Sequence, residues 1–250
     1  MPIFSNDRKC KLENLDKIID EMHEEINGSC DGLIIIGKCN ENALKKLKQK
    51  YKNIVSVNRN STNYEVDEVL CDGRKIAAIA VEYLVSLGHR EIGYVGECHN
   101  ESRYKGYMDV LYKHDIELNP NYIIETNQIE SEGFEVMKKL LQAGEGPSAI
   151  YCANDITAIG MLKCLNRYKN RNYNPSIISS DDIEEAQLTT PMLTTVRLPK
   201  DEMGKFAVYL LLDNLRGEHK SIVRLELEGK LMVRSSCRRF EDSGTCEYYI

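Results

Sequence analysis

Polar side chains that could bind a ligand follow several apolar runs of the sequence. Asn154 and Asp155 come directly after one such run, Asp181 and Asp182 come after another, and Asp72 ends a third. In an open α/β sheet, the carboxyl ends of the strands face the crevice where ligands bind, beside the N–H groups of helix amino termini. Carboxylates accept hydrogen bonds from hydroxyl groups, and an arginine donates several in a fixed fork, so these residue types suit a small polar ligand.

The same residues also have structural explanations. Residue types alone favour Asn154 or Asp155 as the cap of the helix that follows, and Asp182 as the cap of a turn. Arg103 opens a predicted helix, where a cation is unfavourable beside the helix dipole unless an anion or a polar ligand compensates it. Solvation of the Arg103 charge at the surface is an equally good explanation from spacing alone. His89, in a Leu-Gly-His-Arg turn, is predicted to make a structural hydrogen bond rather than to catalyse.

No pattern in the sequence supports catalysis or a metal centre. Asp181 and Asp182 could serve acid–base chemistry, but no His or Cys stands near them at metal-ligand spacing. The sequence contains no Gly-x-Ser-x-Gly elbow, no Walker loop and no Gly-x-Gly-x-x-Gly fingerprint. The 9 cysteines form no Cys-x-x-Cys pair, which favours reduced, mostly buried thiols. We therefore predict a protein that is not an enzyme and that has no cofactor and no metal.

Composition narrows the class of protein further. The chain has 250 residues, of which 42% are hydrophobic and 29% charged, as in a globular protein of one or two domains. No signal peptide and no run of about 20 apolar residues is present, so we predict a cytoplasmic protein without membrane association. The net charge of −6 argues against DNA binding through the chain's own surface, and no helix-turn-helix pattern precedes the α/β region.

Apolar periodicity places the polar residues on alternating strands and helices. Such an alternation predicts an α/β fold with one or two doubly wound parallel sheets. Strands are predicted at residues 2–5, 33–36, 54–58, 68–71, 92–96, 122–125, 149–152 and 176–179, with an extended segment at 191–196. Helices are predicted at residues 11–26, 41–51, 74–87, 102–114, 130–143, 156–165 and 201–215.

The end of the chain departs from this alternation. Two further strands are predicted at residues 222–227 and 231–234, and Glu228 and Gly229 between them are typical of a hairpin turn. The tail after Ser236 is polar and has no core pattern, so it is predicted to be loose.

Several blocks together resemble the effector-binding domain of LacI/GalR-family bacterial transcriptional regulators. Each block alone is weak, but they occur in the family's order and span roughly residues 30 to 238. The blocks lie at residues 83–96, 103–107, 149–160, 180–183, 193–197, 202–204 and 231–236.

The resemblance implies a two-lobed fold like that of periplasmic binding proteins, with doubly wound parallel sheets. Residues 1–68 and 199–228 would form the amino-terminal lobe, and residues 69–198 and 229–250 the carboxyl-terminal lobe. The family's first βα unit has no counterpart in the sequence, which makes the amino-terminal lobe incomplete.

The resemblance also implies a function and a set of site residues. A small effector of the sugar or nucleobase class would bind in the cleft between the lobes. Arg103 matches the family arginine that clamps the effector, Asn154 matches its asparagine partner, and Asp181 matches an aspartate at a strand end. Asn58 stands where the amino-terminal lobe often supplies an aspartate. Replacing Arg103 by alanine would then abolish binding with little effect on stability.

The family pattern further implies a homodimer that binds DNA only through a helix-turn-helix domain not present in these residues. Departures from the pattern affect the pocket, because Ser179 and Ser180 replace a glycine and an aromatic residue and Leu198 replaces a polar hinge residue. Two alternatives therefore stay open beside an effector-sensing regulator. One is a solute-binding protein for sugar transport, which would need a signal peptide. The other is a degenerate protein that dimerises without a ligand.

Overall fold

The computed structural model describes residues 30–37, 41–58, 65–99, 101–168 and 173–240. Contacts divide the chain into two compact units. Unit 1 contains Met1–Leu70 and Lys200–Leu227, and unit 2 contains Cys71–Pro199 and Glu228–Ile250. The predicted strand at 2–5 and helix at 11–26 lie outside the described residues. None of the described helices combines the length and the apolar character needed to cross a bilayer.

Unit 1 contains a four-stranded parallel sheet with the strand order β1-β2-β3-β9. Its elements are β1 (Gly32–Ile36), α2 (Glu41–Lys50), β2 (Asn53–Asn58), β3 (Asp67–Leu70), α7 (Lys200–Arg216) and β9 (Arg224–Glu226). Leu33 of β1 packs with the apolar side chains of α2, whereas the preceding Gly32 faces Leu211 of α7. Because successive strand residues point to opposite faces, α2 and α7 cover opposite faces of this sheet.

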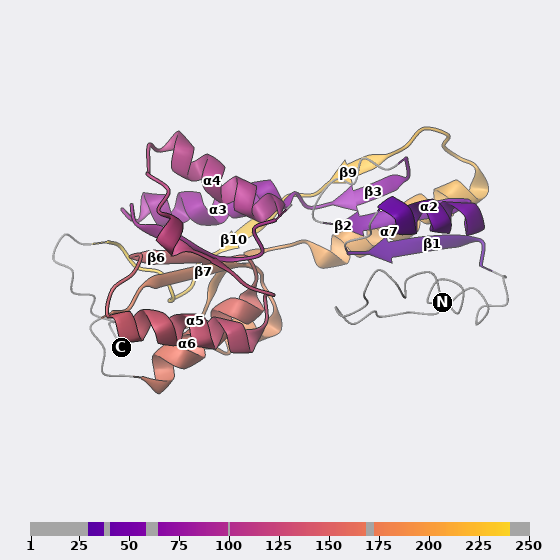
Figure 1. Ribbon diagram of the computed structural model, residues 1–250. Coiled ribbons are helices and arrows are strands. Elements are labelled where there is room, and N and C mark those ends of the chain that lie inside the picture. The colour runs from indigo at the N-terminus through magenta and orange to yellow at the C-terminus, as the bar shows by residue number, and fades with distance from the viewer. Residues whose placement is uncertain (1–29, 38–40, 59–64, 100, 169–172, 241–250) are drawn as a thin grey trace. The chain divides into compact units, whose positions relative to one another are not determined.

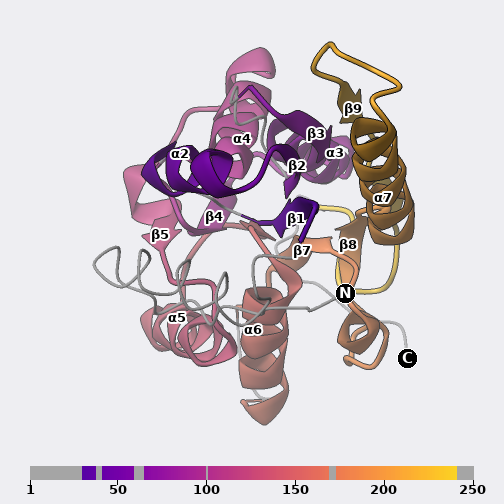
Figure 2. The same ribbon diagram turned by 90° about the vertical axis from the view of Figure 1, so that its right-hand side faces the viewer.

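Unit 2 contains a six-stranded sheet with the strand order β10-β8-β7-β6-β4-β5, in which only β10 is antiparallel. Figures 1 and 2 show helices α3 and α4 on one face of this sheet and α5 and α6 on the other. Its strands are β4 (Ile92–Gly96), β5 (Ile123–Glu125), β6 (Ala149–Cys152), β7 (Ser176–Asp181), β8 (Thr194–Arg197) and β10 (Lys230–Met232). Its helices are α3 (Gly73–Ser86), α4 (Ser102–Lys113), η2 (Pro120–Tyr122), α5 (Glu130–Ala143), α6 (Asp155–Arg167) and η3 (Glu184–Gln187).

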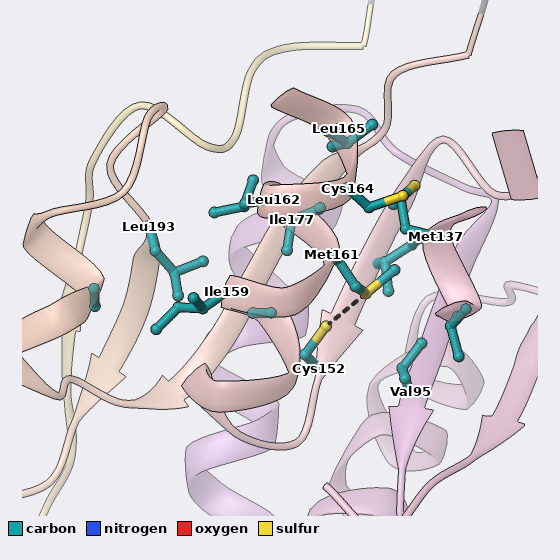
Figure 3. Close-up of a cluster of buried hydrophobic side chains, with 14 of the residues drawn as sticks. Val95, Met137, Cys152, Ile159, Met161, Leu162, Cys164, Leu165, Ile177 and Leu193 are labelled. Atoms are coloured by element: carbon teal, nitrogen blue, oxygen red, sulfur yellow. Dashed lines mark hydrogen bonds between the residues drawn. The ribbon is translucent and has the colours of Figure 1, made fainter. Parts of the chain in front are cut away.

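One hydrophobic core of unit 2 lies between its sheet and the α5–α6 pair. Figure 3 shows apolar side chains of α6 directed at those of the strands, with Cys152 and Met161 at the centre. The thiol of Cys152 donates to the sulfur of Met161 at 3.4 Å. Burial raises the pKa of the Cys152 thiol, with a smaller contribution from the charge of Asp155. Cys152 is thus a buried, protonated thiol.

Helices α5 and α6 approach each other closely because glycines stand where they meet. A Cβ atom on Gly160 of α6 would lie 2.0 Å from the carbonyl oxygen of Glu130, and one on Gly133 of α5 would lie 2.1 Å from that of Thr157. Neither site has space for a larger residue. This contact places the start of α6, where Asn154 and Asp155 lie, against the start of α5.

The α/β class and the parallel sheets are confirmed, and the predicted strands and helices of the described residues are present with slightly shifted ends. The segment predicted as extended at 191–196 forms a strand only from Thr194 to Arg197. The predicted hairpin is wrong. β9 pairs with β3 in unit 1, whereas β10 pairs with β8 in unit 2, so Glu228 and Gly229 connect two different sheets.

The prediction of a loose tail is also wrong for residues 237–240. The Arg238 amide donates to the Ser176 hydroxyl at 3.0 Å, and the Phe240 amide donates to the carbonyl oxygen of Leu87 at 2.9 Å. The packing depends on polar contacts with the backbone, which apolar periodicity does not reveal. Residues 241–250 lie outside the described residues.

Candidate functional site

Three of the four predicted site residues lie at one edge of the unit 2 sheet. Because β7, β6 and β4 are parallel neighbours, their carboxyl ends share this edge. Asp181 is the last residue of β7, Asn154 precedes α6, and Arg103 lies in the first turn of α4, which follows β4. We call Arg103, Asn154 and Asp181 the strand-end site. Asn58 ends β2 in unit 1 and is considered by itself.

Arg103 is buried, with an exposed fraction of 3%. The alternative that its charge is solvated at the surface is therefore wrong. Its Nε donates to Oε1 of Glu101 at 2.9 Å, and one terminal nitrogen donates to the side-chain oxygen of Gln128 at 3.2 Å. The other terminal nitrogen donates to the carbonyl oxygen of Ala153. Arg103 thereby connects the start of α4 with the segments that follow β5 and β6.

The anion that compensates Arg103 is Glu101, which the sequence analysis did not single out. Glu101 is the N-cap residue of α4, and its carboxylate also accepts from the Arg103 amide at 3.3 Å. Its exposed fraction is 1%. Burial lowers the pKa of Arg103, but the hydrogen bond and charge of Glu101 raise it more, so the guanidinium is charged. A buried ion pair therefore lies at the amino terminus of α4.

Asn154 caps α6, as its residue type favoured. Its side-chain oxygen accepts from the Thr157 amide at 3.1 Å, and its nitrogen donates to the carbonyl oxygen of Gln128 at 3.0 Å. Gln128 thus contacts both Arg103 and Asn154. No feature of the sequence pointed to Gln128, because it lies in a loop after β5 and its role depends on a positive φ of 61° and on burial.

Asp181 and Asp182 have different surroundings although both have positive φ angles, of 131° and 48°. The carboxylate of Asp182 accepts from Arg197 and from Arg234, each at 2.5 Å, so its prediction as a turn cap is wrong. Burial raises the pKa of Asp182, but the hydrogen bonds and charges of Arg234 and Arg197 lower it by more. The pKa of Asp182 is therefore below its ordinary value. Asp181 is half-buried, and its negative charge adds a small contribution to the raised pKa of Arg103.

Hydroxyl groups of β7 and β8 contact Tyr151 and the buried carboxylate of Asp155. Ser180 hydrogen-bonds the Tyr151 hydroxyl at 2.9 Å. Ser179 and Thr195 donate to Oδ1 of Asp155 at 2.5 and 2.6 Å. Burial raises the pKa of Asp155 to about 6, although these hydrogen bonds lower it. The serines that replace the family's glycine and aromatic residue are therefore used in polar contacts within unit 2.

His89 has the structural role predicted for it. Its Nδ1 is 2.9 Å from the Ser148 hydroxyl, and its Nε2 donates to the carbonyl oxygen of Arg238 at 3.0 Å. Burial lowers the pKa of His89. The hydrogen bond to the Arg238 backbone raises this pKa, and the charge of Arg238 lowers it. The ring therefore connects the segment around Arg238 with the residues that precede β4.

The strand-end site can donate hydrogen bonds from Arg103 and Asn154 and accept them at Asn154 and Asp181. Within the described ranges, no three His, Cys, Asp or Glu side chains are grouped as metal ligands. The arrangement is suited to holding a polar molecule.

Comparison with known proteins identifies relatives of the chain. Residues 81–237 match the periplasmic binding protein-like domain family. The chain is similar to the HTH-type transcriptional repressor MelR of Bacillus subtilis (strain 168), with 28% identity over 230 residues, 88% of this chain and 67% of MelR. It is also similar to the HTH-type transcriptional repressor CytR of Escherichia coli (strain K12), with 29% identity over 221 residues, 85% of this chain and 64% of CytR.

The chain spans about two thirds of the length of these curated relatives. Among solved structures, it is similar to a sugar-binding transcriptional regulator (LacI family) from Escherichia coli complexed with phosphate. The TM-score is 0.76 and the identity 27%, and the match covers 90% of this chain and 83% of the other.

Proposed function

Since the chain belongs to the periplasmic binding protein-like domain family, as an effector-binding domain of the LacI/GalR type, we propose that it senses a small polar effector for a transcriptional regulator. The effector is of the sugar or nucleobase class. Arg103, Asn154 and Asp181 contact it at the carboxyl edge of the unit 2 sheet, and Asn58 is a further proposed ligand residue. The repressors similar to the chain support the regulatory role.

The observation that carries this proposal is the joining of Arg103 and Asn154 through Gln128. The side chain of Gln128 accepts from Arg103, and its carbonyl oxygen accepts from Asn154. Residues from three successive strand ends are thus held in fixed positions, as a preorganised polar site requires. Asp181, at the neighbouring strand end, adds a carboxylate that can accept from ligand hydroxyls.

A thermal-melt screen of the purified chain tests this proposal. The panel contains sugars, sugar phosphates, nucleosides and nucleobases, because a ligand that binds only the folded state raises the melting temperature. We expect a saturable shift with one chemical class. A cooperative melt that no compound moves would instead favour a degenerate protein that only dimerises.

Two matched variants locate the ligand. Asp181→Asn removes the carboxylate while keeping a residue type that tolerates positive φ, and we expect it to lose the ligand-induced shift. Asp115→Asn is the control, because Asp115 also has positive φ, of 52°, but lies at the other end of α4. A shift that both variants retain unchanged would remove Asp181 from the site.

The oligomeric state and the DNA contact are parts of the same proposal. By family likeness, the chain forms a homodimer, and sedimentation at micromolar concentration as a monomer would contradict this. DNA is contacted through a helix-turn-helix domain that is not among these residues. The effector then acts by shifting the population of regulator conformations, without catalysis. The similarity to transcriptional regulators supports this over transport or enzyme activity.

A further inference from the structure

We propose that Glu101 makes the strand-end site select an uncharged, hydroxyl-rich effector and reject anionic ones, including sugar phosphates and sugar acids. This inference rests on the proposed function, because it takes Arg103 as an effector contact. It goes further by naming the charge class of the effector and the residue that sets it.

The guanidinium of Arg103 is occupied by partners of its own chain. Its Nε is 2.9 Å from the carboxylate of Glu101, and both side chains are almost fully buried, with exposed fractions of 4% and 1%. The terminal nitrogens donate to Ala153 and Gln128. Within the part of the chain that the structure describes, three of the five N–H donors of Arg103 are therefore used, and the remaining two can serve a hydroxyl group of a ligand.

The negative charges around Arg103 disfavour binding of an anion at the strand-end site. Glu101 cancels the charge of Arg103 at close range, and Asp181 adds a negative charge whose field reaches Arg103. In a buried site of low dielectric constant, these charges act strongly on a phosphate or carboxylate placed beside the guanidinium. An uncharged ligand with hydroxyl donors meets no such repulsion, and Asp181 can accept from it.

Capping of α4 alone does not explain why this position is glutamate. Short side chains, Ser, Thr, Asp and Asn, are the preferred N-caps, whereas glutamate is not among them. The longer side chain is what brings a carboxylate to Nε of Arg103 as well as to the Arg103 amide. Burying this charge pair costs desolvation energy that a Ser, Thr or Asn cap would not require, so we assign it a role in selectivity.

The test measures binding of inorganic phosphate to the full 250-residue chain by calorimetry. We expect no saturable binding to the wild-type chain. Glu101→Gln keeps an oxygen acceptor for Arg103 but removes the opposing charge, so we expect it to gain phosphate affinity of at least about ten-fold. The gain disappears in Glu101→Gln/Arg103→Gln. Glu101→Ser, which supplies a preferred cap, replaces the Gln variant if that variant does not fold.

Glu125→Gln is the matched control. Glu125 ends β5 at the same edge of the sheet but its carboxylate is paired with His99, so its loss changes the net charge equally without freeing Arg103. Arg103-dependent phosphate binding in the Glu101 variant alone supports the proposal, whether or not a neutral effector has been found. Phosphate binding by the wild-type chain through Arg103, or no gain in the Glu101 variant, overturns it. A neutral sugar that still binds in that last case would leave the proposed function standing.

Discussion

At the scale of single residues, the burial of Arg103 changes what its substitution should do. The sequence alone predicted that Arg103→Ala would abolish binding with little effect on stability. Because Glu101 would be left as an uncompensated buried charge, we now expect the free energy of unfolding to fall by about 3–5 kcal/mol. Denaturant unfolding of the wild-type chain and the variant measures this.

A double-mutant cycle isolates the contribution of the ion pair. Glu101→Ala/Arg103→Ala removes both charges, so its destabilisation should be clearly smaller than the sum of the two single variants. If the two losses add, the ion pair contributes no coupling and the burial argument for Arg103 fails.

A second residue-scale prediction concerns Asp155, whose pKa is raised to about 6 by burial despite hydrogen bonds from Ser179 and Thr195. A carboxyl whose folded pKa exceeds its unfolded value of 3.8 binds more protons in the native state between those two values. Its stabilising contribution is therefore complete below about pH 4 and is lost as the pH rises through about 6. The loss is about 3 kcal/mol.

The Asp155→Asn variant provides the reference for this pH dependence. Other carboxyls, such as Asp182 with its lowered pKa, change stability in the opposite direction and are common to both proteins. The difference in unfolding free energy, wild type minus Asp155→Asn, should thus decrease between about pH 4 and pH 7. A difference that is flat or increases over this range would contradict the raised pKa.

The strand-end site and the residues that contact or surround it were only partly predictable from sequence. Asn154 and Asp181 could be found because side chains after an apolar run lie at a sheet edge. Glu101 and Gln128 could not, because burial and contacts across loops decide their roles. The same applies to Asp182, where two arginines distant in sequence, Arg197 and Arg234, determine the contacts.

At the scale of elements, the glycine contact between α5 and α6 predicts a strong effect of a small change. Gly160→Ala raises helix propensity, yet its Cβ would meet the backbone oxygen of Glu130 at 2.0 Å. The two helices would have to separate, so we expect a destabilisation of about 2–3 kcal/mol in denaturant unfolding.

Gly204 of α7 is the matched control, because a Cβ there meets nothing within 4 Å. Gly204→Ala should stabilise the protein by about 0.4–1 kcal/mol, since alanine restricts the unfolded chain and favours the helix. If both variants destabilise equally, close packing is not the reason for Gly160.

Periodicity predicted the elements well because each buries one face, but it did not predict sheet membership. β9 and β10 are only a few residues apart and carry a Glu-Gly pair between them, which locally is typical of a hairpin. Their actual partners, β3 and β8, are distant in sequence. Pairing of this kind depends on which edge each sheet leaves open, which a local pattern does not encode.

At the scale of the whole molecule, the chain passes between its two units at three places, after Leu70, Pro199 and Leu227. No composition change marks these positions, so periodicity alone could not have divided the chain into units. The order of the family blocks supplied the two-lobed expectation instead. Unit 1 continues into residues outside the described ranges, and the predicted absence of a first βα unit stays a prediction.

The charge of the whole chain leads to a last prediction. With 33 Lys and Arg against 39 Asp and Glu, the chain has a net charge of −6. Nonspecific DNA affinity comes from lysine and arginine contacts that release counterions from phosphates, so an acidic chain gains little of it. We expect the anisotropy of a labelled duplex to stay unchanged at chain concentrations up to about 10⁻⁵ M, where DNA-binding proteins already bind nonspecifically.

The salt dependence of the same titration decides between two outcomes. If the chain does bind, and its affinity falls steeply with salt, then clustered basic residues contact phosphates in spite of the net charge. DNA contact would then not require a separate helix-turn-helix domain, and that part of the proposed function would fail. If the duplex stays unbound both with and without an effector, then effector sensing and DNA contact belong to separate domains, and the effector can act on DNA only through the conformation of the whole regulator.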